Sequence, residues 1–157
     1  MKFKVWRTVK VGTYPTCADL EKAVNGKCGG RTWFSSLPFI IQPAGTLELT
    51  LVKGFQLGQR RNASRKEICE LAKRARLQEC PNEVAVQLVL QDFIDPYTFE
   101  TNIGSTEKLG DRSDCYMSVN SRLGMVWLNC YVDQPEGFEP SIVWVFVVPQ
   151  TEKSLAV

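Results

Sequence analysis

The fold is decided by the stretch from Glu79 to Phe93, which reads ECPNEVAVQLVLQDF. Its Pro81 ends the preceding helix, because proline pushes the residue before it out of the helical region of backbone space. From Val84 onward, apolar residues recur at every second position (84, 86, 88 and 90), an alternation that favours a strand over a helix. We therefore predict a short helical turn at Pro81 that leads into a strand by about Gln87.

Two principal helices are predicted before this stretch. Ser64 and Glu67 have the spacing of a capping box, and apolar residues follow at helical spacing, so this helix should run to about Leu77. An earlier helix follows Thr16 and ends at the left-handed stop signal of residues 25–26, Asn-Gly.

Alternating or continuous apolar runs predict further strands at residues 2–11, 46–53, 115–120, 125–132 and 142–148. Residues 92–114 are polar and contain glycine, so they are predicted to form a long loop or ragged hairpin. Short turns between the last three strands favour an antiparallel meander. The sequence thus predicts an α+β fold with a mainly antiparallel sheet of about five to six strands, and with two principal helices packed on it. We expect one globular domain over residues 1–150 and a flexible C-terminal tail over residues 151–157.

The absence of histidine limits the possible chemistry of this 157-residue chain. It excludes Ser-His and Cys-His nucleophile pairs and histidine general bases. None of the six cysteines has Cys-x-x-Cys spacing, so buried reduced thiols are favoured over a zinc site or a disulfide framework. No motif indicates a cofactor, and the sequence favours a binding protein over an enzyme without deciding between them.

The apolar segments are too short to cross a membrane. The longest, Ile142 to Val148, has seven residues, whereas a membrane-spanning helix needs about 18. The N-terminus alternates charged and apolar residues and lacks the apolar core of a signal peptide. We therefore expect a cytoplasmic protein without membrane contacts.

The net charge of +2 conceals two opposed blocks. Residues 53–76 contain eight basic and two acidic residues, a local charge of +6, whereas residues 82–114 contain seven acidic and two basic residues, a local charge of −5. The chain is therefore polarised between a basic and an acidic half.

The basic block is the best candidate for a binding surface. Several of its side chains extend from a predicted loop and helix, where they can contact phosphates or acidic groups. The candidate binding residues are Arg60, Arg61, Arg65, Lys66, Lys73, Arg74 and Arg76. The alternative is a solvated helix face on which Glu70 offsets its basic neighbours.

The acidic block contains two Asp-x-x-Asp pairs on either side of the predicted loop. If they converge, their oxygens can bind magnesium or calcium. The candidate metal ligands are Asp92, Asp95, Asp111 and Asp114. The alternative is that these aspartates form ordinary turns.

Two motifs resemble those of a group of uncharacterised bacterial proteins. One is W-x-T-x-x-x-G, here Trp6 to Gly12, and the other is C-P-x-E-V followed by Q-L-x-L-Q, here Cys80 to Gln91. The loop from Pro96 to Asp114 departs from the pattern of that group. The resemblance implies a compact bacterial or mobile-element α+β domain and carries no known activity.

Together these features predict a small binding or regulatory protein of bacterial or phage origin that acts through macromolecular contacts, as an inhibitor for example. Another protein is the expected partner. The first alternative is a metal-dependent nuclease or hydrolase that uses the clustered aspartates. The second is sequence-independent binding of nucleic acid through the basic helix and loop.

Overall fold

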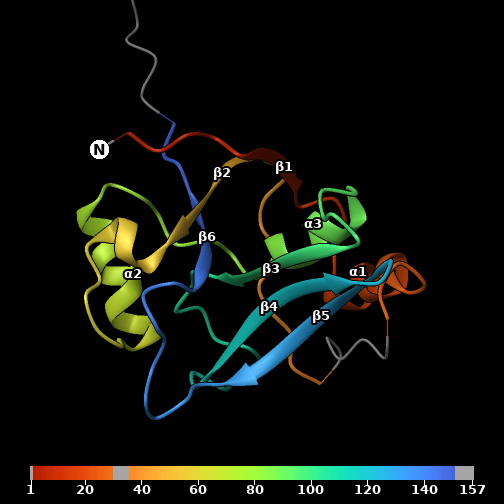
Figure 1. Cartoon of the computed structure of the whole chain (residues 1–157). Helices are drawn as coiled ribbons and strands as arrows, with labels where there is room; N and C mark the ends of the chain where they lie inside the picture. The colour runs from red at the N-terminus through yellow and green to blue at the C-terminus, as the bar shows by residue number, and fades with distance from the viewer. Residues whose placement is uncertain (1, 30–35, 151–157) are drawn as a thin grey trace, which may run out of the picture.

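The computed structural model describes residues 2–29 and 36–150, and these form an α+β fold around one six-stranded sheet (Figure 1). The predicted tail, residues 151–157, lies outside the described residues. The strands lie side by side in the order β1-β2-β6-β3-β4-β5. Their bounds are Arg7–Val11 (β1), Gly45–Lys53 (β2), Thr98–Ile103 (β3), Cys115–Arg122 (β4), Met125–Val132 (β5) and Val143–Val147 (β6).

The sheet is antiparallel except where β6 runs parallel to β3. The predicted hairpin of β4 and β5 is present. The predicted meander is wrong, however, because β6 crosses to the middle of the sheet instead of pairing with β5. The reason is burial on both faces: Trp144 and Phe146 pack on one side of β6 and Val145 on the other. A strand that is apolar on both faces removes the most apolar surface from water when it lies in the middle of the sheet.

The prediction for residues 87–91 is also wrong, because Glu83–Leu90 form a helix, α3. Every residue from Glu83 to Val89 is buried, and a helix that is apolar nearly all round belongs in a core. Alternation and helical spacing cannot be told apart in so short an apolar run. A strand that was not predicted, β3, lies within residues 92–114, the stretch predicted to form a long loop or ragged hairpin.

A polar stripe on α3 explains how this helix is tolerated inside the protein. Glu83, Gln87 and Gln91 follow one another at intervals of four residues, and each amide Nε2 donates to the side chain before it, at 2.9 and 2.8 Å. The fully buried Glu83 also accepts hydrogen bonds from the backbone N–H groups of Gly12 and Gln42, both at 2.7 Å. At the far end, Gln91 bonds both backbone groups of Lys10 in the edge strand β1. The stripe thus joins the helix to two loops and protects one edge of the sheet.

The helices cover the sheet from both sides. Helices α1 (Cys17–Val24) and α3 pack with the first core, which includes Leu20, Val24, Leu88, Met117 and Val145. Helix α2 (Arg65–Arg74) and the short 3₁₀ helix η1 (Gly54–Leu57) pack with the second core, which includes Leu57, Ile68, Tyr116, Trp144 and Phe146. In Figure 1, α2 lies beside β2 and β6, whereas β4 and β5 extend away from it.

Candidate functional site

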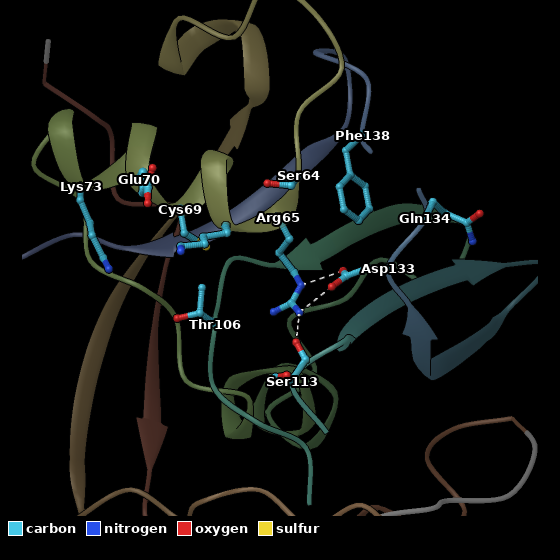
Figure 2. Close-up of a pocket in the computed structure, with 11 residues that line it drawn as sticks. Ser64, Arg65, Cys69, Glu70, Lys73, Thr106, Ser113, Asp133, Gln134 and Phe138 are labelled. Carbon is cyan, nitrogen blue, oxygen red and sulfur yellow. Dashed lines mark hydrogen bonds and ion pairs between the residues drawn. The ribbon is translucent and has the colours of Figure 1, made fainter. Parts of the chain in front are cut away.

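The start of α2 is fixed by the predicted capping box, which the structure confirms. The Ser64 hydroxyl accepts a hydrogen bond from the Glu67 backbone at 3.2 Å, and the Glu67 carboxylate accepts one from the Ser64 backbone at 2.9 Å. These bonds satisfy two donors that a helix end leaves free. Arg65 is therefore the first residue of α2, and its side chain points toward the sheet and away from water (Figure 2).

Arg65 forms an ion pair that ties three distant segments together. Its Nε and one terminal nitrogen donate to the two carboxylate oxygens of Asp133, just after β5, at 3.0 and 2.9 Å. The terminal nitrogens also donate to the backbone carbonyls of Ser105 and Ser113 in the β3–β4 connection. Burial lowers the pKa of Arg65, but the hydrogen bond and charge of Asp133 outweigh it and raise this pKa above its ordinary value. With a side chain only 5% exposed, Arg65 holds the fold together and is not available to an outside partner.

A hollow of about 430 Å³ lies on the outer side of this ion pair (Figure 2). Along it, the ammonium group of Lys73 lies 2.8 Å from the carboxylate of Glu79. Burial raises the pKa of Glu79, but hydrogen bonds from Lys73 and Thr106 lower it by more, to below its ordinary value. Burial raises the pKa of the nearby Cys69 thiol to about 12, so this cysteine is not a nucleophile at neutral pH. Of the charged residues that line this hollow, Arg65, Asp133 and Lys73 thus have ion-pair partners within the protein.

A second hollow, of about 420 Å³, lies between α2 and the loop that precedes it. We call it the arginine hollow, because Arg60, Arg61 and Arg74 all line it. Its other lining residues are Gly58, Gln59, Asn62, Ala63, Glu67, Glu70 and Leu71. The loop is held in place by the buried Gln59, whose amide nitrogen donates to the carbonyls of Arg61 and Phe138 at 3.0 and 2.7 Å. The arginines therefore extend from a fixed backbone.

The predicted binding residues divide into two groups. Arg65 and Lys73 have carboxylate partners within the protein. The other five are exposed, and in residues 2–29 and 36–150 no carboxylate oxygen lies within 4.0 Å of their charged groups. These five are Arg60, Arg61, Lys66, Arg74 and Arg76. The surface around α2 thus presents cations without internal partners.

The four aspartates predicted as metal ligands are all exposed, and three of them have partners within the protein. Asp92 lies 3.4 Å from the ammonium group of Lys27, and Asp114 binds Arg112 at 2.9 Å. Asp95 accepts a hydrogen bond from the backbone N–H two residues ahead, as in a turn. Among the described residues, no three side chains of metal-binding type lie together in a way that could hold an ion. The structure gives the proposed metal site no geometric support.

The cysteines of the described residues are free thiols. Cys80, next to Pro81, is fully buried, and burial raises its thiol pKa well above the ordinary value. Burial also raises the thiol pKa of Cys17, Cys28 and Cys130. The expectation of packed, protonated thiols therefore fits the environment of these residues.

The sequence reasoning missed Asp133 as the partner of Arg65. Asp133 lies 68 residues away and outside the acidic block, so no local pattern links the two. A signal for the burial of Arg65 was nonetheless present. Arg65 precedes Ile68, Cys69 and Ala72 by three, four and seven residues, which places it on the apolar face of the helix.

The chain matches no protein-family model, no curated protein and no solved structure. The resemblance to the group of bacterial proteins therefore stays a prediction. In the described part of the chain, no helix is both long and apolar enough to span a membrane.

Proposed function

We propose that this protein is a binding module that docks an acidic segment of another protein in the arginine hollow. The observation that carries the proposal is the set of exposed cations around α2 that have no carboxylate partner among residues 2–29 and 36–150. Other basic side chains on the surface, such as Lys73 and Arg112, do have carboxylate partners within the fold. Three guanidinium groups line one hollow, two from the loop that Gln59 holds and one from the end of α2, and they suit carboxylates supplied from outside.

The acidic residues of the hollow favour a protein partner over nucleic acid. Glu67 and Glu70 lie among the three arginines and would repel a continuous row of phosphates. A protein segment can place its carboxylates on the arginines and leave uncharged groups opposite these glutamates. Arginine also binds carboxylates with two parallel hydrogen bonds, which gives such a contact a defined geometry.

The test is a binding titration with fluorescently labelled poly-L-glutamate, with a DNA oligonucleotide as the second probe. Replacing Arg60, Arg61 and Arg74 together by glutamine should weaken poly-L-glutamate binding at least about tenfold. The matched control replaces Lys4, Lys22 and Lys108 by glutamine. These three residues are exposed, lie elsewhere on the surface and change the net charge by the same amount. The control variant should bind like the unaltered protein.

Equal losses in the two triple variants would overturn the proposal, because binding would then follow net charge and not the hollow. Tighter binding of DNA than of poly-L-glutamate, lost in the hollow variant, would assign the surface to nucleic acid instead. Binding should weaken as salt rises, since the charges on both sides are screened.

A further inference from the structure

A polar face lies on the part of the sheet that α2 leaves open. The strand register places Glu100 of β3 beside Asn120 of β4, and Asn120 beside Trp127 of β5. One step along, Ser118 of β4 lies beside Asn129 of β5. These side chains belong to the same face as Tyr116, which packs in the second core. The second core covers one half of this face, and the half with the amides remains accessible.

This open half is hollowed into a groove of about 430 Å³. That volume falls within the range of roughly 300–1,000 Å³ that is usual for sites of small molecules. Six side chains that line the groove carry its chemistry: Glu100, Asn120, Arg122, Trp127, Asn129 and Tyr131.

The polar groups of the groove keep unused hydrogen-bonding capacity. The Asn129 amide nitrogen donates to the carbonyl oxygen of Asn120. This bond orients the two amides, and it leaves the Asn120 nitrogen and the Asn129 oxygen for a ligand. Within the described residues, neither Glu100 nor Arg122 has an ion-pair partner within 4.0 Å. The groove therefore offers both hydrogen-bond donors and hydrogen-bond acceptors to a ligand.

The charge of the groove selects against ionic ligands. The opposite charges of Glu100 and Arg122 cancel, so the groove is not electrostatically complementary to a polyanion or to a polycation. The aromatic rings of Trp127 and Tyr131 add flat apolar faces at two places on β5. A neutral ligand that has both hydroxyl groups and an apolar ring face matches these three properties together.

We propose that this groove binds a neutral oligosaccharide. A sugar hydroxyl can both donate and accept a hydrogen bond, which suits the half-buried Asn120 nitrogen, the Asn129 oxygen and the Glu100 carboxylate. The C–H face of a sugar ring packs on an aromatic ring such as that of Trp127. Trp127 and Tyr131 are four positions apart, about 13 Å along an extended strand, which is longer than one sugar ring. The ligand is therefore a chain of at least two sugars.

This inference is independent of the proposed function, because the groove shares no lining residue with the arginine hollow. The test is isothermal titration calorimetry of the full chain with maltohexaose, cellohexaose, chitohexaose and xylohexaose. At least one of these should bind saturably, and the corresponding monosaccharide should bind more weakly. Trp127→Leu should weaken that binding roughly tenfold through the loss of the ring face.

A second variant, Glu100→Gln, keeps the test decisive if Trp127→Leu does not fold. Glu100 is exposed, and its replacement removes a charged acceptor without changing the shape of the side chain. It should also weaken binding several-fold. The matched control is Leu123→Asn in the β4–β5 turn, which is 86% exposed and does not line the groove. The proposal is overturned if none of the four oligosaccharides binds at millimolar concentration, or if the control loses as much affinity as the groove variants.

Discussion

Replacing Arg65 by alanine tests how much this residue contributes to the stability of the fold. The change removes every donor to the Asp133 carboxylate and to the carbonyls of Ser105 and Ser113. Removing one partner of a buried ion pair typically costs about 3–5 kcal/mol, because the other charge is left without compensation. Asp133 is 35% exposed and can regain some water, so we expect the lower part of this range, about 3 kcal/mol.

The measurement is urea unfolding followed by circular dichroism, on Arg65→Ala, Asp133→Asn and the double variant. Asp133→Asn should cost less than Arg65→Ala, because the guanidinium keeps its two carbonyl acceptors. The double variant should cost less than the sum of the two single changes, with a coupling of about 1–2 kcal/mol. A loss below about 1 kcal/mol for Arg65→Ala, or strict additivity of the two changes, would refute the structural role given to this pair.

Two further predictions concern stability. Arg76, where the chain leaves α2, has a left-handed backbone conformation (φ 65°) that suits glycine. Arg76→Gly should therefore raise the free energy of unfolding by about 1 kcal/mol in the same urea assay. A lower free energy of unfolding would contradict this prediction. Burial raises the pKa of Glu107, so its carboxyl group holds a proton more tightly in the native state than in the unfolded chain. The protein therefore loses stability as the pH rises from the ordinary glutamate pKa through the raised pKa of Glu107. Glu107→Gln should therefore be more stable than the unaltered protein at pH 7 and should lose this advantage near pH 3. Thermal melts at the two pH values measure this. An equal difference in melting temperature at pH 3 and pH 7 would show that the charge of Glu107 is not the cause.

The sequence predicts best where a local pattern has one structural meaning. The Ser64 and Glu67 capping box bonds the backbone at one helix start, and the structure contains both of its bonds. The β4–β5 hairpin follows from two apolar runs separated by a two-residue turn at Leu123 and Gly124, both with positive φ. These features depend on neighbours in the chain, which the sequence displays directly.

The predictions failed where the meaning of a pattern depends on distant segments. The run from Val84 to Leu90 is compatible with a strand or with a buried helix, and the choice is made by the loops that donate hydrogen bonds to Glu83. The position of β6 depends on competition among all strands for the centre of the sheet. The partner of Arg65 is supplied by a segment 68 residues away. Such choices are made by tertiary packing, which overrides local preference.

The two charge blocks of the sequence differ in which of their residues have partners within the folded protein. Several acidic residues of the block 82–114 are satisfied internally: Glu83 by backbone N–H groups, Asp92 by Lys27 and Asp114 by Arg112. In the basic block, Arg65 and Lys73 form ion pairs within the protein. Five other basic residues of this block are exposed and have no carboxylate oxygen within 4.0 Å among the described residues. Around α2, exposed cations without such a partner therefore outnumber the exposed Glu67 and Glu70, even though the net charge of the chain is only +2. Since like charges held close together oppose folding, these cations support the proposal of an anionic partner, which would compensate them on binding.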